Sequence, residues 1–245
     1  WTVPTGCVYI RAIVWGSGGH PDGYVNTLSG GDGGSGGYAS AVIPVTEGET
    51  LSVGVGQVNN NGGASKSFGG SGGGFSSVFR GATPLVIAGG GGGGQVNGTE
   101  AGGAGGGTNG QASTDGIGGG SQTSAGPNGS YLQGGSEGGG GGYYGGGGAQ
   151  WYQASGGGSG YVNASGNLHT QLITGNRRTP PGTANPDYVT VTSTGGLQHA
   201  YGGAGNNSGN SQYGTGLVVI HALGQLYDPS SSPTIPTPRN IIATY

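Results

Sequence analysis

Short apolar runs and regular alternation recur along the chain, and both predict β-strands. The strongest run, 7–15, is apolar throughout except for Arg11, so we expect a strand that is covered on both faces or closes a sandwich core, with Arg11 at solvent or an edge. Leu51, Val53 and Val55 alternate with small residues, the period-two pattern of a half-buried strand. Further strands are predicted at 38–45, 75–80, 84–88, 187–194, 215–223 and, in the tail, 241–243.

The stretch 84–94 combines a strand signal with a run of six glycines. Residues 85–88 form an apolar run bounded by proline and glycine, which is too short for a buried helix and predicts an inner strand. The three-residue connection at 81–83 predicts a hairpin with the preceding strand. An amphipathic helical period is found nowhere along the chain, so the fold class we expect is all-β with almost no α-helix.

Glycine supplies 68 of the 245 residues and proline 12, whereas glycine averages about 7%. Such a composition is typical of low-complexity or disordered chains, but the recurrent strand patterns favour a packed structure. Glycine runs form left-handed helices with three residues per turn and no internal hydrogen bonds. Packed side by side, their backbone groups bond to neighbouring helices, whereas collagen needs glycine only at every third position. We expect such a bundle mainly from 16–37, 56–74, 89–160 and 202–216.

Seven sequence features occur in an order that resembles a known class of glycine-rich domains. They are Trp-x-Val-Pro at 1–4, the strand 7–15 ending in glycines, the strand 38–45, Glu-Gly-Glu-Thr-Leu-Ser-Val-Gly-Val-Gly-Gln at 47–57, Gly-Gly-Gly-Phe-Ser-Ser-Val-Phe at 72–79, Leu-Val-Ile-Ala and its glycines from 85, and the pair 156–161 and 214–220. Together they resemble the glycine-rich domain of the anaplastic lymphoma kinase and leukocyte tyrosine kinase receptors, and the glycine-rich modules of tailed-phage fibres and adhesins. The resemblance spans about residues 1–223.

This resemblance implies a TNF-like jelly-roll β-sandwich carrying an inserted bundle of polyglycine-II helices. The domain would occupy 1–223, and 224–245 would be a proline-rich extended tail. In the receptors this region engages a protein ligand, and in phage adhesins the loops at the bundle tip contact bacterial surface glycans or proteins. The single cysteine, Cys7, departs from the receptors and favours a virion or microbial surface protein.

Charge and cysteine content exclude several classes of protein. Six basic and nine acidic residues leave a net charge of −3, without the basic face of a nucleic-acid-binding protein. One cysteine excludes an intrachain disulfide framework, and we expect Cys7 to be buried as a small apolar residue. Because no apolar run approaches 18 residues, we expect no membrane insertion. The chain has no methionine, so we expect residue 1 to come from processing or from within a longer chain.

Catalytic and metal-binding signals are weak. His20, His169, His199 and His221 lack metal-ligand spacing. The Gly-Gly-Gly-Ser-Gly string at 156–160 and several Gly-x-Gly-x-x-Gly strings lack the strand and helix context of a nucleophile elbow or a nucleotide site. We therefore predict no enzyme, no catalytic residue, no cofactor and no metal.

Two groups of residues are candidates for binding. Aromatic rings with polar tips suit glycan stacking and interface anchoring, and four lie between glycine runs: Tyr143, Tyr144, Trp151 and Tyr152. The alternative is that they pack over the bundle as its own small core. In the tail, Ile241, Ile242 and Tyr245 are candidates for assembly by strand addition.

The function that we expect is a non-enzymatic attachment or structural module, extracellular or on a virion surface. Its target would be a protein or a surface glycan, and the chain would form a homo-oligomer or a larger assembly without nucleic acid. Two alternatives remain open: a filament or virion assembly subunit joined through its C-terminal tail, and a receptor-type ligand-binding ectodomain.

Overall fold

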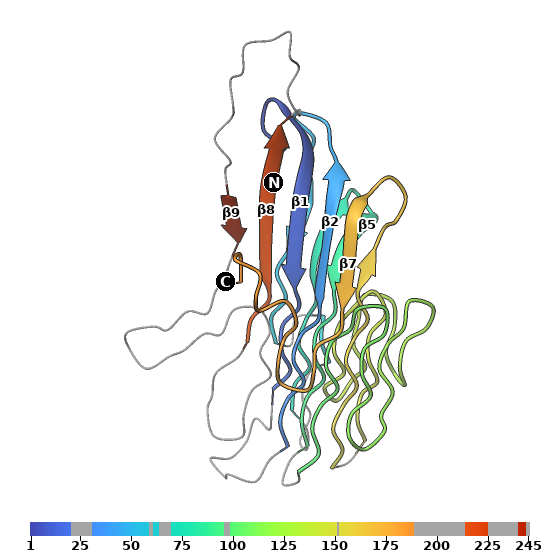
Figure 1. Ribbon diagram of the computed structural model, residues 1–245. Helices are drawn as coiled ribbons and strands as arrows, with labels where there is room; N and C mark the ends of the chain where they lie inside the picture. The colour runs from blue at the N-terminus through green and yellow to red at the C-terminus, as the bar shows by residue number, and fades with distance from the viewer. Residues whose placement is uncertain are drawn as a thin grey trace.

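The computed structural model describes residues 1–20, 31–58, 61–63, 70–95, 99–150, 152–188 and 214–224, and the backbone of 240–243. This part of the chain contains no helix, and therefore none that is long and apolar enough to cross a membrane. Its strands form two antiparallel sheets, and extended glycine segments run side by side below them (Figure 1). The all-β expectation is confirmed.

The larger sheet has five strands and places the first and last long strands of the chain side by side. In spatial order they are β7 (Leu168–Ile173), β2 (Tyr38–Pro44), β1 (Cys7–Trp15), β8 (Leu217–Gly224) and β9 (Asn240–Ala243). Three of the four long strands match the predicted ranges closely. β7 was not predicted from the sequence, because five of its six residues are exposed and the usual apolar alternation is missing.

The smaller sheet is a meander of four strands in sequence order: β3 (Ser52–Gly54), β4 (Ser76–Arg80), β5 (Thr83–Ala88) and β6 (Tyr161–Val162). The predicted hairpin is confirmed, since β4 and β5 pair across the turn at Gly81, whose φ of 57° suits glycine. A register shift between Val78 and Phe79 makes a bulge in this pair. β5 lies between β4 and β6, as expected of an inner strand.

The main core fills the space between the two sheets. Val53, Val78, Val86 and Val162 are paired across the four strands of the smaller sheet, and all four belong to this core. Alternate residues of β1, such as Ile10, complete it from the larger sheet. Fully burying a valine side chain stabilises the fold by roughly 1.5–3 kcal/mol, so this row is a main source of cohesion between the layers.

The opposite face of the larger sheet is also covered, which explains why β1 is apolar on both faces. Trp15 and Tyr38 pack edge to face with ring centroids 5.1 Å apart, and Tyr188 lies 5.6 Å from Trp15. The indole Nε1 of Trp15 donates a hydrogen bond of 2.9 Å to the carbonyl of Pro181. Arg11, on the same strand, is exposed as expected, and Cys7 is buried as expected.

The glycine segments form a second layer of structure, which we call the glycine bundle. It consists of 16–20, 31–37, 61–63, 70–74, 89–94, 101–107, 110–120, 134–148 and 155–160, which bond to one another through their backbones. Strands β1 and β5 run directly into it at Gly16 and Gly89. Of the expected bundle ranges, 21–30, 59–60, 64–69, 96–98, 151 and 202–213 lie outside the described residues.

Hydrogen bonds around 89–94 repeat every three residues. The N–H groups of Gly90 and Gly93 donate to Gly141 and Gly138, while the carbonyls of the same two glycines accept from Gly158 and Ser155. Counting donors and acceptors, 89–94 bonds to six segments: 17–20, 34–37, 70–73, the segment of Gly103, 138–141 and 155–158. All of these bonds measure 2.7–3.0 Å. The segment is therefore surrounded on all sides by backbone.

Glycine is required here by close approach and not by a left-handed conformation. None of residues 89–94 has positive φ. A Cβ added to Gly91 would lie 2.0 Å from the carbonyl oxygen of Gly34, and one added to Gly92 would lie 2.1 Å from that of Ser155. Real Cβ atoms essentially never approach closer than 3.0 Å, so any side chain at these positions would force the neighbouring segments apart.

Candidate binding surface

The outer face of the smaller sheet carries the most prominent group of aromatic side chains. Gly54, Ser77, Ile87 and Tyr161 are paired across β3, β4, β5 and β6. Because side chains alternate along a strand, this row faces away from the core valines. Two features therefore share one face of the sheet: a tyrosine cluster at the β6 end and a hollow at the β3 end.

The tyrosine cluster comprises Tyr131, Tyr143, Tyr144 and Tyr161. Tyr143 stacks on Tyr161 with ring centroids 4.1 Å apart and an interplanar angle of 13°. Tyr131 and Tyr144 meet Tyr143 edge to face at 5.3 and 5.4 Å, and an isolated backbone bridge joins Tyr131 to Tyr144. Contacts of these kinds each contribute about 0.5–1.5 kcal/mol beyond the area that they bury, so the cluster is a rigid platform.

The cluster keeps exposed edges despite its packing. Tyr131 is 45% exposed, and the other three rings are half-buried. Burial, with contributions from Tyr161, Tyr131 and Tyr144, raises the pKa of the Tyr143 hydroxyl. The phenol therefore stays protonated at neutral and mildly alkaline pH, where it can donate a hydrogen bond to a ligand.

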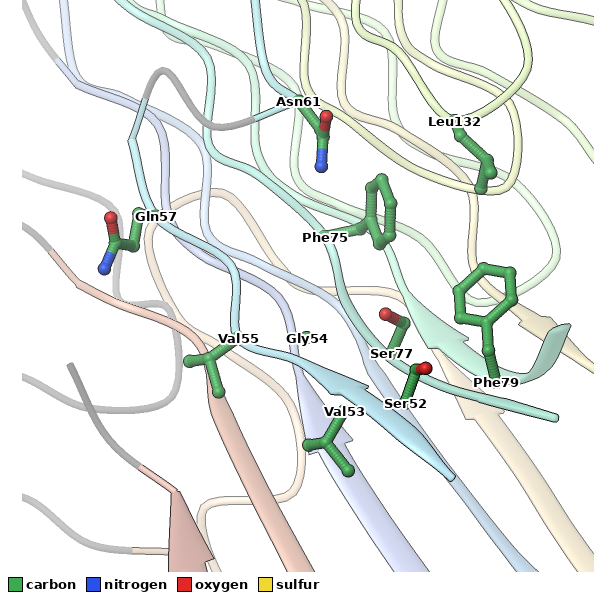
Figure 2. Close-up of a pocket in the computed structure, with 10 residues that line it drawn as sticks. All are labelled: Ser52, Val53, Gly54, Val55, Gln57, Asn61, Phe75, Ser77, Phe79 and Leu132. Carbon is green, nitrogen blue, oxygen red and sulfur yellow. The ribbon is translucent and has the colours of Figure 1, made fainter. Parts of the chain in front are cut away.

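The hollow lies beside the cluster and has a volume of about 620 Å³. Ligand pockets in proteins measure roughly 300–1,000 Å³. Figure 2 shows Phe75, Phe79, Leu132 and Asn61 gathered on one side of β3. Leu132 directly follows Tyr131 of the cluster, and its N–H bonds to the carbonyl of Tyr143, so the hollow and the cluster adjoin.

Free polar groups line the hollow together with the rings. None of the ten lining residues is charged. Among the described residues, the hydroxyls of Ser52 and Ser77 and the amide of Asn61 make no hydrogen bond. Asn61 has a φ of 59°, a left-handed conformation that is uncommon outside glycine. Gly54, which has no side chain, also lines the hollow, and a Cβ added there would lie 2.9 Å from the Ser77 hydroxyl oxygen.

The structure describes three of the four aromatic residues that the sequence singled out, and it places them at two separate locations. Tyr143 and Tyr144 come together in the tyrosine cluster, half-buried near the sandwich. Tyr152 lies beyond the glycine segment 145–148, is 50% exposed, and accepts a hydrogen bond on its carbonyl from Gln95 at the end of 89–94. Trp151 lies outside the described residues.

The tail residues fall partly within the larger sheet. Ile241 and Ile242 belong to β9, which pairs with Ile220 and Val219 of β8 in the same chain. Tyr245 lies outside the described residues. The strand predicted at 187–194 also lies mostly outside them, since only Asp187 and Tyr188 are described.

The far end of the bundle carries a pair of carboxyl groups. Ala154 N–H donates to Asp115 Oδ2 at 2.9 Å, while Asp115 Oδ1 is buried without a partner. Burial raises the pKa of Asp115, and the neighbouring carboxylate of Glu100 raises it further. Within the described ranges, no group of three or more His, Cys, Asp or Glu side chains is arranged to hold a metal ion.

Sequence reasoning missed Tyr131, Tyr161, Phe75, Phe79 and Leu132. A signal was present at 75–79, where Phe75, Ser77 and Phe79 alternate with Ser76 and Val78. Large rings on the side of a strand that faces away from the core indicate a second packed or binding surface. Tyr131 and Leu132 reach this surface only through contacts between segments that are far apart in the sequence, so no local sequence pattern predicts their position.

Models of known protein families yield no match to this chain, and neither do curated protein sequences.

Proposed function

We propose that this protein is a non-enzymatic attachment and structural module of an extracellular or virion surface. The glycine bundle is then a set of polyglycine-II helices that hold binding surfaces in place. One observation carries the proposal: the N–H and carbonyl groups of 89–94 bond to six surrounding segments with a three-residue period. A left-handed helix with three residues per turn repeats with the same period.

The sheet order supports a jelly-roll path for the sandwich. In the larger sheet the strands run β8, β1, β2, β7, so the last of these four in sequence returns to lie beside the first. This is the spatial order of a Greek key, the unit from which jelly rolls are built. Strands β3, β4, β5 and β6 form the second layer, so the Greek-key order of the larger sheet lies within a two-sheet sandwich.

A bundle of this kind is better suited to holding binding surfaces in place than to catalysing a reaction. Its interior contains almost nothing but backbone, and its backbone groups are already bonded to one another. It offers few interior side chains for acid–base or nucleophilic work. Every segment is tied to several others, so the surfaces at its margins are held in fixed positions, and preorganised surfaces bind at a lower entropic cost.

Attachment is tested by measuring binding of the purified protein to a panel of bacterial and eukaryotic cells and to a glycan array. A Gly91→Ala variant, which breaks the bundle, should lose at least tenfold in binding. The matched variant Gly118→Ala, whose added Cβ meets only Pro127 at 3.8 Å, should bind like the original protein. Failure of the original protein to bind any cell or array surface contradicts attachment.

The tail supports a second candidate function, assembly into a filament or particle. β9 adds to the edge of β8 through Ile241 and Ile242, and a sheet edge that takes a strand from its own chain can take the same strand from a neighbouring copy. Deleting 225–245 should then lower the mass measured by light scattering at high protein concentration. An unchanged mass contradicts assembly through the tail.

A further inference from the structure

We infer that the hollow beside β3 and β4 is a binding site for a neutral oligosaccharide. This inference rests on the proposed attachment function and assigns its ligand class to one place. It differs from binding at the far end of the bundle, where Tyr152 and the Asp115 carboxyl lie.

Ring geometry is the first argument. Phe79 lies on the outer face of β4, and Phe75 directly precedes that strand. The two contribute half-buried aromatic rings to the lining (Figure 2). The negative face of an aromatic ring attracts weakly positive hydrogen atoms. The apolar face of a pyranose ring presents several such C–H groups in one plane, so it packs on an aromatic face without losing hydroxyl hydration.

Unpaired polar groups are the second argument. The Ser52 and Ser77 hydroxyls and the Asn61 amide make no hydrogen bond within the described residues. Each can both donate and accept, as can every sugar hydroxyl. A purely apolar partner such as a hydrophobic helix would bury these groups without partners, at about 1–3 kcal/mol for each.

Charge decides between neutral and acidic saccharides. Within the described part of the chain, no residue that lines the hollow is charged. Arg80, the nearest cation in the sequence, is held by Glu49 and by the Pro44 carbonyl. A sialic or uronic acid carboxylate would therefore leave water for a site that offers no counter-charge, which is unfavourable.

The tyrosine cluster extends the same surface. Tyr131 precedes Leu132 of the hollow and is 45% exposed. A saccharide longer than the hollow would run from Phe79 past Leu132 toward Tyr131, where a second ring face and a phenol hydroxyl are available. We therefore expect affinity to rise with the length of the oligosaccharide.

The test uses the full chain and four neutral tetrasaccharides (cellotetraose, maltotetraose, a mannotetraose and chitotetraose), with tetragalacturonic acid as the acidic probe. Binding is followed by titration calorimetry and by saturation-transfer NMR. At least one neutral probe should bind, and the acidic probe should bind at least tenfold more weakly. Absence of binding by all neutral probes, or equal binding of the acid, overturns the inference.

Two variants locate the site. Phe79→Ala removes a ring, and Ser52→Trp fills the hollow from an exposed position on the edge strand β3, where it leaves the core untouched. Each should weaken binding at least tenfold, whereas Tyr152→Ala, an exposed aromatic at the other end of the bundle, should change it less than twofold. Unfolding midpoints show whether Phe79→Ala still folds, and Ser52→Trp carries the test if it does not.

The outcomes separate this inference from the proposed function. Tetrasaccharide binding that survives Ser52→Trp overturns the site, while attachment to cells can still stand. A change of oligomeric mass in Ser52→Trp, without saccharide binding by the original protein, identifies the hollow as a contact between copies and overturns the inference. Loss of both tetrasaccharide and cell binding in Ser52→Trp supports both statements.

Discussion

The β-sandwich is held together by side chains, whereas in the glycine bundle the backbone makes the contacts. Between the sheets, Val53, Val78, Val86 and Val162 form a row of apolar side chains in which Val78 and Val86 are fully buried. In the bundle, the donors and acceptors of 89–94 bond to six neighbouring segments at 2.7–3.0 Å. The same chain therefore forms two well-packed regions, one through contacts between side chains and the other through hydrogen bonds between backbone groups.

The energetics of the two regions differ accordingly. A buried apolar side chain contributes roughly 1.5–3 kcal/mol, but a hydrogen bond adds only about 0.5–1.5 kcal/mol net. Ordering the backbone costs about 1–2 kcal/mol per residue and most for glycine. The bundle therefore depends on many segments bonding together and on anchorage by β1 and β5, which enter it directly from the sandwich.

The largest effect is expected from adding one methyl group to the bundle. In Gly91→Ala the new Cβ would sit 2.0 Å from the Gly34 carbonyl oxygen, so at least two segments must move apart. We expect a loss of about 3–5 kcal/mol, above the usual range for overpacking because the obstacle is backbone. Chemical denaturation measures it.

Gly118→Ala is the matched control for this prediction. Its Cβ would meet only Pro127 at 3.8 Å, and its φ is not positive, so stability should change by less than about 1 kcal/mol. Equal losses in the two variants would show that backbone packing does not stabilise the bundle.

Removing methyl groups from the core of the sandwich should lower stability by a smaller amount. The cause here is an empty cavity, whereas in the bundle it is a steric clash. Val86 is fully buried in the main core, and Val86→Ala leaves a cavity that costs about 2–3 kcal/mol. Val162, half-buried in the same row, should lose less. A loss at Val162 as large as at Val86 would contradict the assignment of the core to burial between the sheets.

The smallest expected effects concern the pH dependence of folding stability, which should differ in sign between the sandwich and the bundle. In the sandwich, the hydrogen bonds from Arg80 lower the pKa of Glu49, so this pair stabilises the fold above the ordinary value of 4.5 and is lost as pH falls through the folded-state pKa. Because the pair is partly exposed, Arg80→Ala should cost about 0.2–1 kcal/mol at pH 7 and less in strong acid, where only the hydrogen bond from Arg80 to the Pro44 carbonyl remains.

Asp115 in the bundle should show the reverse pH dependence. Burial raises its folded-state pKa above 3.8, so ionisation is disfavoured in the folded state and stability declines as pH rises through that pKa. Asp115→Asn should remove this decline, worth less than about 1 kcal/mol at a partly exposed group. Stability curves from pH 2.5 to 7 measure both variants, and parallel curves for the two would contradict the opposite signs.

Local pattern predicted most of the sandwich because burial on one or both faces leaves a readable period. The ranges 7–15, 38–45, 75–80 and 84–88 match β1, β2, β4 and β5. β7 escaped because its exposed residues carry no such period. Of the candidate site, Tyr143 and Tyr144 were found by their position between glycine runs, but their partners Tyr131 and Tyr161 were not.

By itself the sequence determined the strand class, the near absence of charge, and the need for backbone to pack on backbone in the glycine runs, because these follow from composition and short-range period. Only the tertiary structure decided which segments surround 89–94, that β9 returns to β8, and that Tyr131, Tyr143 and Tyr161 meet beside a hollow lined by Phe75 and Phe79. Glycine has no side chain to specify a partner, so the register of the bundle is set by the strands and turns that it connects.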